Sequence, residues 1–206
     1  KFAGVSIPVF SLRSKESCGI GDFADLRKMV DWANKTNLSV IQLLPINDTS
    51  ANMSWRDSYP YNCISTLALH PIYISLKETG ELKDTRLAEE IDKQSKILNG
   101  KEAVDYDEVI TLKLKFLKAF FEQQKQTLLR KRGFKTFLKE NKQWLEAYAA
   151  FCVLRDKFKS ANYRNWGEWA VYSAELVERV KQEFADEFNF YGFVQWVADS
   201  QMQKAK

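Results

Sequence analysis

The chain has 206 residues, of which 45% are hydrophobic and 28% charged, and its formal net charge is +4. This is the composition of an ordinary globular domain, and it excludes intrinsic disorder, collagen-like repeats and a coiled coil along the whole length. No run approaches the roughly 18 apolar residues that a membrane-spanning helix requires, so we expect no membrane partner. The small, dispersed charge excess also argues against a nucleic-acid partner.

The cysteines Cys18, Cys63 and Cys152 are odd in number and lie far apart in the sequence. They fit reduced thiols better than a disulfide framework, so we expect a cytoplasmic location. The first residue is Lys1, and no signal-peptide pattern follows it. We therefore expect the chain to be a piece of a longer protein.

The first elements in chain order are a strand, a helix and a second strand. Residues 5–9 alternate between apolar and polar positions and predict a short strand, weakened by Pro8. Asp22 is the expected N-cap of a helix whose apolar stripe covers residues 23–33. The nearly continuous apolar run at residues 40–44 is typical of a parallel strand that is covered on both faces. Together these elements predict a right-handed βαβ unit.

A geometric consequence follows for the segments that come after the two predicted strands. Residues 10–21 and residues 45–62 must leave the sheet at the same edge, because the strands are parallel. In α/β folds this carboxyl edge is where ligands bind. We therefore look for a site there.

The rest of the chain is predicted to be helical, because all four prolines lie within the first 71 residues. Apolar stripes at spacings of three and four predict helices over residues 87–98, 110–121, 144–158, 169–184 and 190–197. Gly133 is the expected C-cap of the second of these helices. Two strands alone do not make a stable sheet, so the pattern indicates an incomplete α/β architecture with a helical insertion.

Two candidate motifs, His70 and Gly19-Ile20-Gly21, are too incomplete to predict a functional site. His70 is the only histidine, and a zinc site needs three or four ligands, so we interpret it as a structural residue beside Pro71. The segment Gly19-Ile20-Gly21 lacks the third glycine of a dinucleotide-binding motif. No metal-binding or phosphate-loop pattern occurs, and we expect neither a metal nor a cofactor.

The densest basic cluster consists of Arg130, Lys131, Arg132 and Lys135. It could bind an anionic ligand. Cations also favour the C-terminal end of a helix, and Gly133 is expected to end one there. We favour this structural interpretation.

Residues 48–62 are the most unusual segment. They contain two carboxylates, one arginine and three aromatic residues, namely Asp48, Asp57, Arg56, Trp55, Tyr59 and Tyr61. Such groups recognise sugars, because carboxylates bond hydroxyl groups and aromatic rings cover the apolar faces of the sugar ring. The alternative is a structural Ω-loop packed by its own aromatic residues. The residues alone leave both open, as they leave open an Asp48–Asp57 glycosidase pair, whose carboxyl separation the sequence does not give.

Four blocks with tight internal spacing carry a family resemblance: residues 7–14 (IPVFSLRS), 19–26 (GIGDFADL), 41–48 (IQLLPIND) and 57–62 (DSYPYN), followed by Ser65 and residues 68–73 (ALHPIY). With these blocks the chain resembles the 4-alpha-glucanotransferases, also called amylomaltases or disproportionating enzymes. The likeness is strongest over residues 4–76 and continues more weakly along the rest of the chain.

The resemblance implies an α/β fold, namely part of a (β/α)8 TIM barrel with a mostly α-helical insertion. Residues 1–76 would form the start of the barrel, with its first two strands and first helix. Residues 77–189 would be the helical insertion, and residues 190–206 the helix that leads to a missing third strand.

The resemblance also implies a retaining double displacement, in which an Asp attacks the anomeric carbon and a Glu serves as acid and base. These carboxylates and a second Asp lie on later strands of the family fold, so we assign no catalytic residue here. The chain alone is expected to be inactive. Asp48 and Asp57 match none of the family's catalytic positions.

The expected substrate-binding residues are part of the donor site, namely Tyr61, Asp57, Ser58 and Ser65. Tyr61 matches a family tyrosine whose ring stacks on the sugar beside the scissile bond. Asn47 and Asp48 are expected to support the loop, because carboxylates and amides bond the backbone of turns well.

The expected partners are an α-1,4-glucan or malto-oligosaccharide and the remainder of the protein's own barrel. Two alternatives to an enzyme fragment stay open. One is a non-catalytic glucan-binding module, and the other is a helical interaction module.

Overall fold

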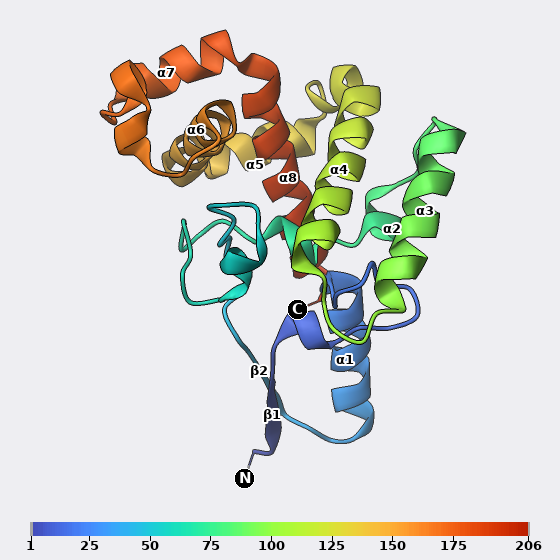
Figure 1. The fold of residues 1–206 in the computed structure, drawn as a ribbon. Helices are drawn as coiled ribbons and strands as arrows, with labels where there is room; N and C mark the ends of the chain where they lie inside the picture. Colours follow the sequence, from blue (N-terminus) through green and yellow to red (C-terminus); the bar gives the residue numbers. More distant parts are fainter. Residues whose placement is uncertain (1, 206) are drawn as a thin grey trace.

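The computed structural model describes residues 2–205 and contains the predicted βαβ unit (Figure 1). Strands β1 (Gly4–Ile7) and β2 (Val40–Leu43) pair in parallel, with Gly4 opposite Val40 and Ile7 opposite Leu43. Helix α1 (Phe23–Lys35) connects them. Asp22 begins this helix as predicted, because its carboxylate accepts hydrogen bonds from the amides of Ala24 (2.9 Å) and Asp25 (3.2 Å).

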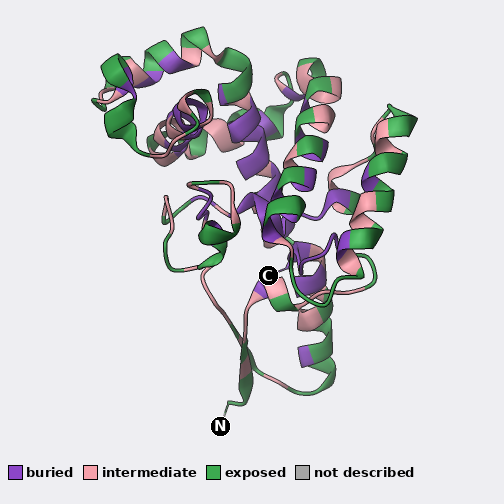
Figure 2. Cartoon of the chain, viewed as in Figure 1, coloured by how far each residue is buried: buried purple, intermediate pink, exposed green. Residues whose placement is uncertain are grey.

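The strands differ from expectation in length and in burial. Strand β1 ends at Ile7, and Val9 lies instead in the 3₁₀ turn η1 (Val9–Ser11). The prediction that the second strand is covered on both faces is wrong for the described part of the chain, since Val40 is 50% exposed and no residue of β2 is buried. The reason is that the sheet has only two strands within residues 2–205, so beside α1 the pair extends away from the other helices with little cover (Figure 2).

The remaining helices follow in chain order: α2 (Leu76–Thr79), α3 (Thr85–Asn99), α4 (Tyr106–Leu128), α5 (Arg132–Glu140), α6 (Lys142–Phe158), α7 (Ala174–Glu183) and α8 (Ala185–Gln203). Each predicted apolar stripe corresponds to one of them, but α7 begins only after Trp169, which lies in the 3₁₀ turn η5 (Gly167–Trp169). The sequence patterns missed α2 and α5. Helix α8 spans the expected division at residue 190, and the division of the chain into three parts stays a prediction.

The prediction that Gly133 ends a helix is wrong. Helix α4 ends at Leu128, and Gly133 is the second residue of α5. The chain starts a new helix there because Phe134 becomes fully buried, with its ring 5.6 Å from that of Trp196 in α8. Arg132 therefore lies at the start of a helix, and the expected dipole explanation of the basic cluster does not hold for it.

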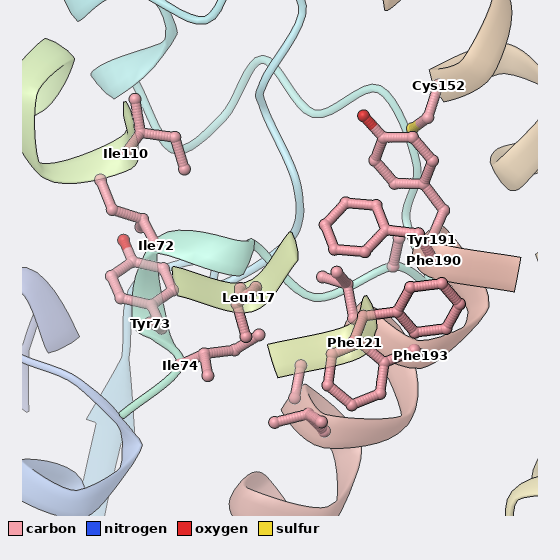
Figure 3. Close-up of a cluster of buried hydrophobic side chains, with 14 of the residues drawn as sticks. Ile72, Tyr73, Ile74, Ile110, Leu117, Phe121, Cys152, Phe190, Tyr191 and Phe193 are labelled. Atoms are coloured by element: carbon pink, nitrogen blue, oxygen red, sulfur yellow. The ribbon is translucent and has the colours of Figure 1, made fainter. Parts of the chain in front are cut away.

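The core lies between α4, α8 and the 3₁₀ turn η3 (Pro71–Tyr73). Figure 3 shows Leu117 of α4 beside the residues of η3, and Phe121 of α4 beside the phenylalanines of α8. The ring of Phe121 lies 5.5 Å from that of Phe193. The helices thus pack directly on the segment that follows β2.

Within residues 2–205, no helix has the length and apolar character needed to cross a membrane.

Candidate functional site

The segment after β2 forms a closed loop that we call the 48–62 loop. Its two ends are joined by backbone hydrogen bonds, from the Asp48 amide to the Ala68 carbonyl (2.9 Å) and from the Ile64 amide to the Asp48 carbonyl (2.8 Å). Residues on either side of the loop thus form a short paired base. This base lies at the carboxyl edge of the two-stranded sheet, where the sequence predicts a site.

Asp48 and Asn47 lie at the base of the loop. The Asp48 carboxylate is fully buried and accepts hydrogen bonds from the Ser50 amide (2.9 Å) and from the Tyr148 hydroxyl of α6 (2.6 Å). The Asn47 side-chain amide donates to the Thr66 carbonyl (2.8 Å). These bonds agree with a loop-supporting role for both residues.

Asp57 bonds the interior of the loop. Its carboxylate accepts from the backbone amide (2.7 Å) and the side-chain amide (2.9 Å) of Asn52, and from the Ser54 amide (3.4 Å). Its backbone carbonyl accepts from the Thr49 hydroxyl. Asp57 is only 4% exposed. Most of its hydrogen-bonding capacity is therefore used to fix the shape of the loop.

The aromatic residues of the loop point to solvent. Trp55, Tyr59 and Tyr61 are 65%, 62% and 60% exposed. The rings of Tyr59 and Tyr61 lie 5.5 Å apart at an angle of 48°. A loop packed by its own aromatic residues would bury them, so polar bonds rather than these rings hold the loop together. The rings are free to cover a ligand.

A pocket of about 300 Å³ lies next to this loop. As predicted, the segments after the two strands meet there, because Phe10 and Ile20 of the first segment and Thr49, Asp57 and Ser58 of the second all line the pocket. The pocket combines apolar walls with a few polar groups, which is the usual character of a small-molecule site.

The structure brings only some of the predicted binding residues together. Asp57 and Ser58 border the pocket, whereas Tyr61 lies outside its lining on the exposed side of the same loop. Ser65 lies in a separate hollow beside Trp144, and its hydroxyl accepts from the Ala68 amide (3.1 Å). A ligand that touches Tyr61 would have to extend out of the pocket.

Comparison with known proteins identifies the family. The sequence profile of the 4-alpha-glucanotransferases (glycoside hydrolase family 77) matches residues 7–206. The chain belongs to this family.

Named 4-alpha-glucanotransferases share this likeness over nearly the whole chain. The rice protein DPE2 is 38% identical over 98% of this chain, which corresponds to 22% of the rice protein. The Chlamydia caviae protein is 34% identical over 98% of this chain and 37% of its own length. The chain thus spans well under half the length of these curated relatives.

Solved amylomaltases share the fold. The Corynebacterium glutamicum enzyme has a TM-score of 0.75 at 22% identity, over 99% of this chain and 28% of that chain. The Streptococcus agalactiae amylomaltase in complex with acarbose has a TM-score of 0.76 at 22% identity, over 100% of this chain and 40% of that chain. At this identity the likeness shows the fold alone.

Sequence reasoning for this glucanotransferase-family chain missed part of the pocket wall. Tyr106, at the start of α4, and the exposed Val104 also line the pocket. Neither residue lies near the loop in the sequence, and neither is among the predicted site residues, although residues 104–106 belong to the weaker part of the family likeness. His70 also lines the pocket, but its ring accepts from the Ile72 amide (3.1 Å) and contacts the Tyr106 hydroxyl (2.6 Å). These contacts agree with a structural role for His70.

His70 predicts a pH dependence of stability. Burial lowers the pKa of His70, and this outweighs the opposing effect of Asp48, whose Oδ1 lies 3.9 Å from Nδ1. The unfolded chain therefore takes up a proton near pH 6.5 that the folded chain still excludes. The contribution of His70 to stability is full above about pH 6.5 and is lost as the pH falls toward the lowered pKa.

The check is urea unfolding at pH 7 and pH 5.5 of the natural protein and of His70→Asn, because asparagine also caps short helices well. The loss of unfolding free energy on acidification is expected to be smaller in the variant than in the natural protein. Equal losses in both proteins would contradict a neutral buried His70.

Proposed function

We propose that the natural protein containing this chain is a 4-alpha-glucanotransferase that transfers α-1,4-glucan segments between malto-oligosaccharides. Membership of the family and the names of its relatives support this proposal. The structural observation that carries it is the 48–62 loop, a polar-bonded loop that presents three exposed aromatic rings at the carboxyl edge of the sheet. In this proposal the two strands and α1 are the first part of a (β/α)8 barrel.

The proposed chemistry is a retaining double displacement whose carboxylates come from later strands of the barrel. Residues of this chain would bind and orient the donor. The exposed ring of Tyr61 would cover one face of a glucose unit, and Ser58 would bond a hydroxyl at the pocket rim. Asp57 would act through the shape of the loop, because its carboxylate already accepts bonds from Asn52 and Ser54. Transfer prevails over hydrolysis when an acceptor glucan occupies the site and excludes water.

The experiment is incubation of the natural protein with maltotriose and chromatography of the products. We expect glucose together with oligosaccharides longer than maltotriose. The 206-residue chain by itself is expected to form no product. Glucose release without longer oligosaccharides would contradict transfer. Glucan binding without any product would favour the non-catalytic binding module.

A further inference from the structure

Two helices far away in the sequence hold the base of the 48–62 loop. The Tyr148 hydroxyl of α6 donates to the buried Asp48 carboxylate (2.6 Å). The Gln195 amide of α8 pairs with the backbone of Leu69, accepting from its amide (2.8 Å) and donating to its carbonyl (2.9 Å). Gln195 also donates to the Tyr148 hydroxyl (3.2 Å). One continuous polar network thus connects both sides of the loop base, at Asp48 and at Leu69, to α6 and α8.

Arg155 provides a second contact from α6. It is 2% exposed, and its guanidinium donates to the Ser50 carbonyl (2.5 Å) inside the loop. The same group donates to the Asp156 carboxylate (3.0 Å and 2.9 Å) and to the Tyr191 hydroxyl (2.9 Å). Tyr191 in turn donates to Asp156. These bonds fix the plane of the guanidinium, so it can bond Ser50 in one orientation only.

These residues act on the loop without reaching the pocket. Tyr148, Arg155 and Gln195 are buried, and none of them lines the pocket beside the loop. Any effect that they have on a ligand in this pocket must therefore pass through the position of the loop. The polar bonds are directional, whereas apolar packing alone would allow the loop to shift.

We propose that Tyr148 and Arg155 are positioning residues, which hold the 48–62 loop and its exposed rings in the binding conformation before the substrate arrives. The helical part of the chain then serves as a rigid support for the donor site. The identity of the substrate rests on the proposed function, whereas the claim that Tyr148 and Arg155 keep the 48–62 loop conformationally ordered does not. A loop that is ordered in advance does not have to lose conformational freedom on binding, which strengthens binding.

The first test is Tyr148→Phe in the natural protein. The variant leaves Asp48 without its hydroxyl partner but keeps the ring in place. We expect KM for maltotriose to rise about tenfold and kcat to change less than about twofold. Hydrogen exchange should become faster at the amides of Ser50, Asn52 and Ile64 and stay unchanged in α4. Unchanged KM and unchanged exchange would overturn the proposal.

A matched control separates positioning from general stability. Val180→Ala removes fully buried apolar atoms from α7, which packs on α6 and α8. It lowers overall stability and is expected to leave KM unchanged. If it raises KM as much as Tyr148→Phe does, the effect is one of stability and the proposal fails. Arg155→Lys keeps the charge but loses the forked geometry, so we expect an intermediate KM.

The decisive test is a double-mutant cycle between Tyr148→Phe and Tyr61→Ala. If Tyr148 acts by positioning the loop that carries Tyr61, its loss should have much less effect on KM once the Tyr61 ring is gone. Full additivity would overturn the proposal. Hydrogen exchange needs no glucan, so it tests positioning separately from activity. If the loop exchanges faster in Tyr148→Phe but the natural protein has no transferase activity, the proposed function alone is refuted. If the natural protein is active but the loop in Tyr148→Phe exchanges as before, positioning alone is refuted.

Discussion

Replacement of Tyr61 by alanine is expected to lower kcat/KM for glucan transfer about 30-fold in the natural protein. The ring is 60% exposed in the structure, and in the proposed function it becomes buried when a glucose unit covers it. Burying an aromatic side chain contributes about 2 kcal/mol relative to leaving it in water. This free energy is gained on binding and corresponds to roughly 30-fold in rate at low substrate concentration. Stability should change by less than about 0.5 kcal/mol, because few native contacts are lost.

Two further variants make the Tyr61 prediction specific. Tyr163 is also a surface tyrosine, 52% exposed, but it lies between α6 and α7 outside the loop. Tyr163→Ala is expected to leave kcat/KM unchanged. Tyr61→Phe keeps the ring and should retain most of the activity if stacking is the main contribution. Steady-state kinetics with maltotriose checks all three variants, and an unaffected Tyr61→Ala would exclude the ring from the donor site.

Local interactions explain what could be predicted from the sequence. The N-cap at Asp22 depends on amides two and three residues away, so the pattern around it was sufficient to place α1. The bonds of Asp57 to Asn52 and Ser54 are also local, and the spacing Ser54-x-x-Asp57 is a capping-box pattern that could have revealed them. The composition of the loop marked its aromatic residues, but their exposure came from the structure.

Distant contacts explain what could not be predicted. Tyr148 meets Asp48 across 100 positions of sequence, and nothing local to either residue marks the pair. The prediction at Gly133 failed for a similar reason, because burial of Phe134 against α8 outweighs the tendency of glycine to end a helix. The burial of β2 depends on its neighbours in the sheet, which an apolar run does not specify. The supporting part of the candidate site therefore becomes visible only in three dimensions.

Gly21→Ala is expected to destabilise the protein by about 3 kcal/mol, because no space exists for a side chain at this position. A Cβ atom on Gly21 would lie 2.0 Å from the carbonyl oxygen of Val9 and 2.8 Å from the amide nitrogen of Leu12. Both are backbone atoms of the segment at η1, so they cannot rotate away. The amide of Gly21 also donates to the Phe10 carbonyl (3.1 Å), which fixes the close approach.

Gly133→Ala is the matched control for this substitution. Gly133 is the second residue of α5, and an added Cβ would meet no atom within 4 Å. Alanine should therefore stabilise the protein slightly, by less than about 1 kcal/mol, since glycine is less favourable than alanine in a helix. Urea unfolding of both variants checks the pair, and equal effects would contradict the close contact at Gly21. Because Phe10 and Ile20 line the pocket, a Gly21→Ala protein that still folds should also bind its ligand more weakly.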